Sequence, residues 1–168
     1  MQGNYICKIP SFEEMNQKWD EEIRKHASDR ETWSLWKKNF LENVEKNDTI
    51  PYYGILDGKV ICESIAVINP VKLQNSDGLV GKHMAYLCGF RTMKPFQKRG
   101  YFSTLMKFMS DNLRKKGFLR VTLAVEHSEK RNREIYAHYG FTERIKSEKE
   151  TYPDGTVTEV EYYGKDLW

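Results

Sequence analysis

The sequence predicts a mixed α/β fold, in which helices flank a central twisted sheet with both parallel and antiparallel strands. Helix-like and strand-like runs follow one another in the order β α α β β β α β α β β. An Asp-Gly dipeptide, typical of hairpin turns, joins the strand-like runs at 50–56 and 59–68 and indicates antiparallel pairing. A helix-like segment separates the runs at 84–93 and 119–126, and such crossovers connect parallel strands. We therefore expect a mixed sheet.

Length and composition indicate one domain over residues 1–168. The chain is 39% hydrophobic and carries a net charge of only +3, which is too small to argue for nucleic-acid binding. The three cysteines are widely spaced and the four histidines show no zinc pattern, so we expect no metal. We also expect reduced thiols in a cytoplasmic protein. No apolar run approaches membrane-spanning length, so no membrane association is expected.

Two amphipathic helices are predicted after a first strand at residues 4–9. Ser11-x-x-Glu14 is a capping box, and apolar residues follow it at helical spacing to about residue 27. Ser28-x-x-Glu31 predicts a second capped helix. The apolar stripe of that helix consists of Trp33, Trp36, Phe40 and Val44. Both stripes are most simply explained as core.

A strand, a basic turn and a helix follow one another in the middle of the chain. The strand-like run ends at Met93, and the turn Gln97-Lys98-Arg99-Gly100 opens a helix. The apolar stripe of this helix consists of Phe102, Leu105, Met106, Met109 and Leu113. Since a helix N-terminus presents backbone N–H groups and a positive dipole end, this turn is a candidate anion site. The alternative is a basic loop that merely begins a helix.

The last third of the chain adds a strand, a helix and a hairpin. The strand at 119–126 is followed by a short helix from Ser128 to about Tyr139. Strand-like runs at about 142–152 and 156–163 enclose Pro153-Asp154-Gly155, a strong turn signal.

The block from about Ala85 to Phe141 resembles the GNAT acyltransferase superfamily. The family's Gln/Arg-x-x-Gly-x-Gly/Ala motif corresponds to Gln97-x-x-Gly100-x-Phe102. Its Leu-Tyr-x-x-x-Gly-Phe signature corresponds to residues 135–141, with Tyr136 at the tyrosine position. Two departures are Phe102 in place of a small residue and Glu129 where the family often has Asn. The resemblance implies the mixed-sheet fold and an N-acetyltransferase that uses acetyl-CoA.

The resemblance also implies where acetyl-CoA binds. Its pyrophosphate would lie on backbone N–H groups from about Lys98 to Ser103, and Gly100 lets the backbone come close. The pantetheine arm would pair with the backbone of the preceding strand at residues 90–92. Phe102 either turns into the core or crowds the pocket. The expected cofactor-binding residues are Phe90, Arg91, Thr92, Gln97, Lys98, Arg99, Gly100, Tyr101, Phe102, Ser103 and Tyr136.

The implied reaction is direct transfer of an acetyl group to a primary amine of a small molecule or protein. Tyr136 matches the family position that protonates the departing sulfur, although it could also be a packing residue below Phe141. Glu63 is the first candidate for the general base, because it lies among apolar neighbours and could face a cleft; it could equally face solvent. Glu126, His83 and His127 lie near strand ends and are weaker candidates. Cys88 is expected in the core, since no local signature supports a nucleophile.

Other interpretations remain open at this level. In GNAT-like proteins the two N-terminal helices often form one wall of an acceptor cleft, so they could do so here instead of only packing. The chain could also be a non-catalytic acyl-CoA-binding or regulatory domain of the same fold. A nucleic-acid module using basic residues such as Lys98, Arg99 and Lys115 is the least favoured reading, so no nucleic acid is expected. The last strand could pair with a second copy, which would give a homodimer.

Overall fold

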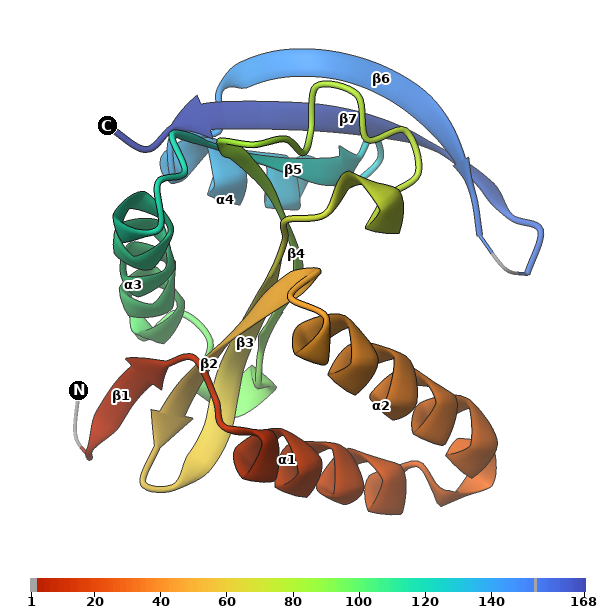
Figure 1. Cartoon of the computed structure of the whole chain (residues 1–168), viewed down its shortest axis with the longest axis vertical. Helices are drawn as coiled ribbons and strands as arrows, with labels where there is room; N and C mark the ends of the chain where they lie inside the picture. The colour runs from red at the N-terminus through yellow and green to blue at the C-terminus, as the bar shows by residue number, and fades with distance from the viewer. Residues whose placement is uncertain (1–2, 153) are drawn as a thin grey trace. The chain divides into compact units, whose positions relative to one another are not determined.

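The computed structural model describes residues 3–152 and 154–168, and the described part forms seven strands and four α-helices (Figure 1). The strands are β1 (Tyr5–Lys8), β2 (Thr49–Leu56), β3 (Lys59–Val67), β4 (Met84–Thr92), β5 (Arg120–Glu126), β6 (Glu143–Thr151) and β7 (Val157–Asp166). The α-helices are α1 (Phe12–Lys25), α2 (Arg30–Glu45), α3 (Tyr101–Lys115) and α4 (Lys130–His138). Short 3₁₀ turns cover η1 (Ala27–Asp29), η2 (Pro70–Lys72) and η3 (Lys94–Phe96).

The strands form a seven-stranded sheet in the order β1-β2-β3-β4-β5-β7-β6. The pair β1–β2 is antiparallel, β4–β5 is parallel, and β7 runs antiparallel to both β5 and β6. The crossover from β4 to β5 contains α3, as expected for parallel neighbours. The predicted mixed α/β fold and element order are therefore confirmed.

The chain folds as two compact units. The first comprises Met1–Ile65 and Gly89–Met109, and the second comprises Ala66–Cys88 and Ser110–Trp168. The boundary between the units divides β3, β4 and α3 along their length. A single domain over residues 1–168 stays a prediction.

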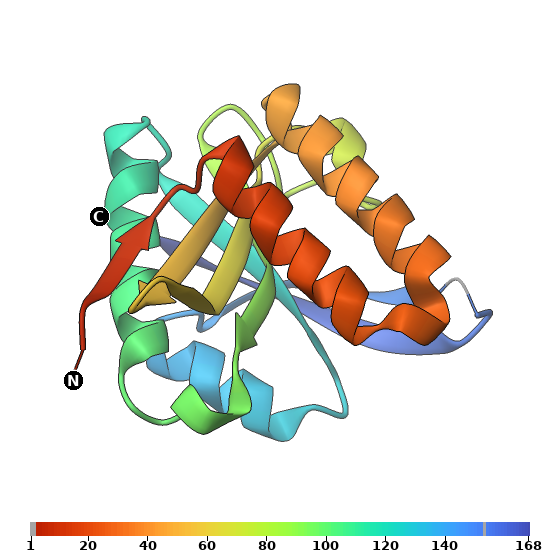
Figure 2. The same cartoon turned by 90° about the horizontal axis from the view of Figure 1, so that it is seen from below.

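In the first unit, α1 and α2 lie side by side as an antiparallel pair (Figure 2). The predicted capping box is present, since the Ser11 hydroxyl accepts from Glu14 N and the Glu14 carboxylate accepts from Ser11 N. Met15 of α1 packs with Tyr53 and Ile55 of β2, and Phe40 and Val44 of α2 cover this cluster. These helices therefore close one small core.

The second predicted capping box, at Ser28, is wrong. The chain forms the 3₁₀ turn η1 there, with Asp29 N donating to His26 O at 3.0 Å, so α2 begins at Arg30. Asp29 is the N-cap, and its side chain makes no capping hydrogen bond. The stripe on α2 is also only partly core. Trp33 stacks on His26 with ring centroids 3.9 Å apart, whereas Trp36 remains 47% exposed.

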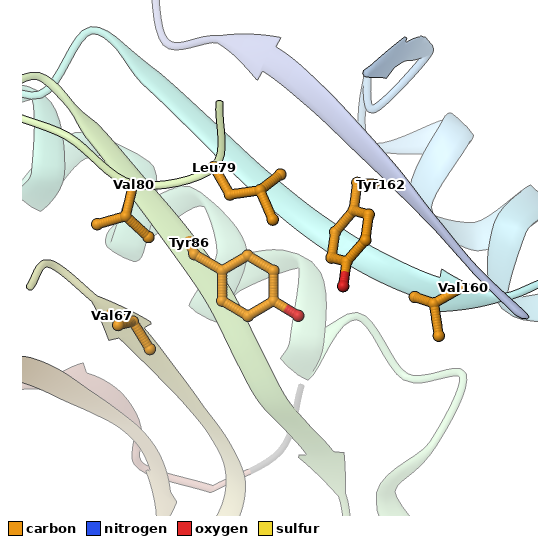
Figure 3. Packing of buried hydrophobic residues seen from close by; sticks show 6 residues of the cluster. All are labelled: Val67, Leu79, Val80, Tyr86, Val160 and Tyr162. Carbon is orange, nitrogen blue, oxygen red and sulfur yellow. The ribbon is translucent and has the colours of Figure 1, made fainter. Parts of the chain in front are cut away.

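In the second unit, β7 lies between β5 and the long strand β6 (Figure 1). One core cluster contains residues from both chain segments of this unit: Val67, Leu79, Val80, Tyr86, Val160 and Tyr162 (Figure 3). The rings of Tyr86 and Tyr162 lie 6.5 Å apart between their centroids. Tyr152 and Thr156 close the β6–β7 hairpin by a backbone hydrogen bond of 2.8 Å, while Pro153 of the predicted turn lies outside the described residues.

None of the helices in the described part of the chain combines the length and the apolar character that crossing a membrane requires.

Candidate active site

The regular geometry of strand β4 is interrupted at Gly89. Its parallel pairing with β5 joins Met84–Leu87 to Arg120–Leu123 and so ends before this glycine. Gly89 has a φ of +64°, which lies in the left-handed region and interrupts regular strand geometry. A Cβ at this position would lie 3.1 Å from Ile65 Cδ1. The backbone angle therefore favours glycine here, and a Cβ would also require the Ile65 side chain to shift by a few tenths of an ångström.

The turn after β4 is built from unusual backbone angles and one side-chain bond. Gln97 Nε2 donates to Thr92 O at 3.0 Å and so ties the turn to the end of β4. Lys98 and Gly100 have φ values of +60° and +83°. The carbonyl of Gly100 accepts from the backbone N–H and the hydroxyl of Thr104, both at 3.1 Å, and α3 begins there. The predicted strand, turn and helix are thus confirmed as local structure.

This turn offers an anion an open backbone and two cations. No heavy atom lies within 4 Å of a Cβ built on Gly100. Lys98 and Arg99 are exposed, and within the described residues neither makes an ion pair. The first N–H groups of α3 have no acceptor inside the helix, because no preceding turn exists. The residues present therefore fit a phosphate group. Ser103 is exposed in the same first turn.

Two aromatic residues after Gly100 pack inside the first unit. Tyr101 is buried, and its carbonyl accepts from the hydroxyl of Tyr5 at 2.9 Å. Phe102 is half-buried and meets Phe90 of β4 edge to face, with ring centroids 5.6 Å apart. The structure thus brings the predicted residues Phe90 and Phe102 into contact. It places both at the junction of β4 and α3.

A pocket of about 690 Å³ lies in the first unit, along α1, β3 and the end of β4. Glu63 of β3 lines it and forms an ion pair with Lys18 of α1 at 2.8 Å. Arg91 of β4 also lines it, with Nη1 lying 3.9 Å from Glu63 Oε1. Glu63 therefore faces a pocket, as one of the two sequence alternatives expects, and two cations stabilise its charge.

Sequence reasoning missed Glu22, a fourth member of this charged group. Glu22 is buried, at 5% exposure, and its Oε1 and Oε2 lie 3.4 Å from Arg91 Nη2 and Nη1, respectively. The available signal was its position on α1, since a charged residue three after Trp19 and next to Ile23 falls on the apolar stripe.

Tyr136 belongs to the second unit, on α4. It is half-buried, and its carbonyl accepts from the N–H of buried Phe141 at 3.0 Å. Burial, and to a lesser extent the charge of Glu129, raises the pKa of the Tyr136 hydroxyl above its usual value. This hydroxyl therefore keeps its proton at neutral pH, as a proton donor must.

The weaker candidates for general base have structural partners. Glu126 accepts a hydrogen bond from the hydroxyl of Tyr152, and His83 Nδ1 lies 3.1 Å from Gly117 O. His127 lies 3.5 Å from the carboxylate of Glu161. Burial raises the pKa of the Cys88 thiol to about 11, which disfavours the nucleophilic thiolate.

No group of three or more His, Cys, Asp or Glu side chains that could hold a metal ion occurs within residues 3–152 and 154–168.

Both sequence motifs lie in a part of the chain that matches a known protein family. The model of the acetyltransferase (GNAT) family matches residues 10–141, a span that contains both motifs. A comparison with curated proteins gives no match. Among solved structures, ribosomal-protein-S18-alanine N-acetyltransferase from Escherichia coli is 17% identical with a TM-score of 0.68, and the match covers 98% of this chain and 94% of that one.

Two further solved structures share the fold at similar distance. An N-acetyltransferase from Staphylococcus aureus is 12% identical with a TM-score of 0.70, over 98% of this chain and 99% of that one. RimL, a ribosomal L7/L12 alpha-N-protein acetyltransferase in complex with coenzyme A, is also 12% identical with a TM-score of 0.70, over 99% of this chain and 95% of that one. At these identities the likenesses show the fold.

Proposed function

Because this chain belongs to the acetyltransferase (GNAT) family, whose members use acetyl-CoA, we propose that the turn at residues 97–103 binds the pyrophosphate of acetyl-CoA. The acceptor is a primary amine of a small molecule or protein. The observation that carries the proposal is the open backbone at Gly100, with its positive φ and no heavy atom within 4 Å of a Cβ. Lys98 and Arg99 would pair with phosphate oxygens, since guanidinium and ammonium groups bind phosphate strongly.

We place the pantetheine arm along Phe90, Arg91 and Thr92. Two features support this placement. The register of β4 with β5 ends at Leu87, and Gly89 then turns the backbone out of regular strand geometry. Gln97 holds the turn against the carbonyl of Thr92, so the strand end and the phosphate turn form one continuous binding element. Pairing with a ligand along a strand end follows the geometry of β-augmentation.

For the chemistry, the thioester of acetyl-CoA supplies an acyl group that is activated for attack. Glu63 accepts a proton from the acceptor ammonium, so that the neutral amine forms its bond to the acyl carbon as the carbon–sulfur bond breaks. Tyr136 donates its proton to the departing sulfur, which leaves as a thiol, and the second proton that the nitrogen loses on becoming an amide returns the Tyr136 phenolate to the phenol. The transfer runs directly from the thioester to the amine, and a covalent intermediate on Cys88 is disfavoured because burial raises the pKa of that thiol to about 11.

We propose that the reaction takes place in the cytoplasm. The support is that Cys7, Cys62 and Cys88 are all free thiols, as a reducing compartment favours.

Isothermal titration of the purified protein with acetyl-CoA tests this proposal, with adenosine diphosphate as the control ligand. We expect micromolar binding of acetyl-CoA and much weaker binding of the control, because turn and strand act together. Release of free thiol is then measured with a panel of primary amines. Absence of acetyl-CoA binding contradicts the proposal, and binding without turnover on any amine indicates a non-catalytic acyl-CoA-binding domain.

A further inference from the structure

Three carboxylates of the second unit share one face of the sheet with the buried tyrosine Tyr162, and we call this the acidic face. The strand register places Glu126 of β5 and Glu148 of β6 on either side of Val160 of β7. Residues two apart in a strand point to the same face, so Glu150 and Tyr162 join this group. The Tyr162 hydroxyl donates a hydrogen bond to the Glu150 carboxylate, and these two side chains therefore meet.

Two of the three carboxylates lack a cationic partner among the described residues. Glu148 forms an ion pair with Lys146 at 3.0 Å, and this ammonium also lies 5.6 Å from the centroid of the Tyr162 ring. Glu126 and Glu150 accept hydrogen bonds from tyrosine hydroxyl groups, which carry no charge, and neither makes an ion pair in the described part of the chain. The acidic face therefore has an excess of negative charge.

Three cations near these strands gather around a different carboxylate, that of Glu161. Arg133 donates to this carboxylate at 3.0 Å, and Arg144 and His127 each lie 3.5 Å from it. Glu161 precedes Tyr162 directly in β7, so its side chain points to the opposite face of the sheet. These cations therefore leave the acidic face uncompensated.

Tyr86 of β4 adds a buried hydroxyl group to the acidic face. It pairs in register with Thr122 of β5, four residues before Glu126, and so points to the same face. Its ring lies 6.5 Å from the ring of Tyr162 between centroids, and the hydroxyl ends of the two rings converge (Figure 3). Tyr86 is only 8% exposed, and its hydroxyl makes no hydrogen bond to a described residue.

The Tyr86 hydroxyl can be reached by a ligand and lies close to charged groups. Whereas the hydroxyl of Tyr53 is fully enclosed, that of Tyr86 keeps accessible surface. Burial raises the pKa of the Tyr86 hydroxyl, and smaller contributions come in turn from Cys88, Glu150 and Tyr136. Since a nearly buried hydroxyl without a partner is costly, this position favours a ligand that donates a hydrogen bond beside Glu150.

We propose that the acidic face binds the non-reacting ammonium group of the acceptor, which is a linear diamine or polyamine. This ammonium donates to the Tyr86 oxygen and to Glu150, and Glu126 attracts further positive charge. The proposal rests on the proposed function, because it makes the bound amine the acceptor of the acetyl group. Tyr136, the proposed proton donor, supports this assignment, since it lies close enough to Tyr86 to interact with it electrostatically.

Three four-carbon probes that differ only at one end test the charge of the ligand: 1,4-diaminobutane, butylamine and 4-aminobutyrate. Binding of each to the full chain is measured by ligand-observed NMR and titration calorimetry, with and without coenzyme A. We expect 1,4-diaminobutane to bind most tightly and 4-aminobutyrate most weakly, because the acidic face repels a carboxylate. Equal binding of the diamine and butylamine, tighter binding of 4-aminobutyrate, or no binding of any probe overturns the proposal.

Glu150→Gln keeps the shape of the side chain and removes its charge. Glu159→Gln is the matched control, because it removes the same charge from an exposed residue on the opposite face of the same hairpin. We expect Glu150→Gln to weaken 1,4-diaminobutane about tenfold or more, the loss of a charge-assisted hydrogen bond. Glu159→Gln should leave the affinity within about twofold, as surface substitutions usually do. Equal affinity of the two variants, with folding checked by thermal melts, contradicts the role of Glu150.

Tyr86→Phe keeps the ring and removes only the hydroxyl. Because this hydroxyl has no hydrogen-bond partner among the described residues, the melting temperature should not fall. The affinity for 1,4-diaminobutane should fall about tenfold, since the ammonium loses one hydrogen-bond acceptor. A lower melting temperature with unchanged diamine affinity assigns the hydroxyl to the fold and overturns its role in binding.

The acetyl-CoA titration on the same proteins distinguishes this inference from the proposed function. If acetyl-CoA binds but diamine binding depends on neither Glu150 nor Tyr86, the acceptor assignment fails alone. If acetyl-CoA does not bind, the acetyl-transfer function fails, whatever the probes show at the acidic face.

Discussion

Substitution of Gly100 by aspartate tests the phosphate turn directly. Gly100 has a φ of +83°, and no heavy atom lies within 4 Å of a Cβ built there, so the added Cβ meets no protein atom. The change therefore acts in two ways: it strains the backbone, and it adds a carboxylate at the proposed pyrophosphate position. A residue other than glycine in this region costs roughly 1–2 kcal/mol of stability.

The electrostatic effect can be estimated separately from the strain. Two unit charges of the same sign about 5 Å apart repel by roughly 1–3 kcal/mol at an effective dielectric constant of about 80 to 20. We therefore expect the Kd of acetyl-CoA to rise by about fivefold to 150-fold. The added Cβ also separates the backbone from the phosphate, which acts in the same direction.

Gly117→Asp is the matched control for the strain. Gly117 has a φ of +89° and also has no heavy atom within 4 Å of a Cβ, but it follows α3 and lies outside the proposed site. Calorimetry with acetyl-CoA and urea unfolding are measured for both variants. Both should lose similar stability, and only Gly100→Asp should lose affinity. Equal affinity of the two folded variants would refute the placement of the pyrophosphate on this turn.

Three further outcomes are expected. Tyr136→Phe should slow turnover by about a hundredfold or more, the usual size of a general-acid contribution, and leave the acetyl-CoA affinity unchanged. The control variant Tyr139→Phe should not slow turnover. Equal rates of the two variants in a steady-state assay assign Tyr136 to packing. Tyr53→Phe should raise the free energy of unfolding in urea by about 1 kcal/mol, because it removes a buried hydroxyl without a partner. Tyr162→Phe should lower it, because that hydroxyl donates to Glu150. A change of the same sign for both variants contradicts these hydrogen-bond assignments. Burial raises the pKa of the Tyr53 hydroxyl, so above about pH 10 the unfolded state loses this proton while the folded state keeps it. The free energy of unfolding therefore falls by about 1.4 kcal/mol per pH unit above that pH, and the gain from Tyr53→Phe should grow. A gain that stays constant with pH rules this coupling out.

Periodicity predicted the elements well where local chemistry decides their ends. The Ser11 capping box and the Asp-Gly hairpin each satisfy their own backbone groups, so neighbours in sequence are sufficient. The capping box predicted at Ser28 does not form, because the three residues before α2 form a 3₁₀ turn, which moves the helix start beyond the serine. A short motif cannot reveal that competing turn, since both conformations use the same local residues.

The site was less predictable because its parts come from distant segments. The turn at Gly100 could be predicted from the sequence, since positive φ selects glycine and the motif has fixed spacing. The burial of Glu22 could not be predicted, because it depends on Arg91, which lies 69 residues away in the chain. Glu63 had two open orientations, and only the position of Lys18 on α1 decides between them. Charge pairing across elements is therefore the information that the sequence lacks.

The departure from the family motif at Phe102 has a structural counterpart in the preceding strand. Where the motif has a small residue, the ring of Phe102 lies edge to face on Phe90, and such pairs contribute about 0.5–1.5 kcal/mol beyond their buried area. The contact fastens the first turn of α3 to the end of β4, and Gln97 fastens the same strand end from the other side of the turn. Two anchors thus hold the backbone around Gly100 without occupying the open space beside it. A rigid and open turn lowers the cost of ordering on ligand binding, so the large residue is compatible with the proposed phosphate site.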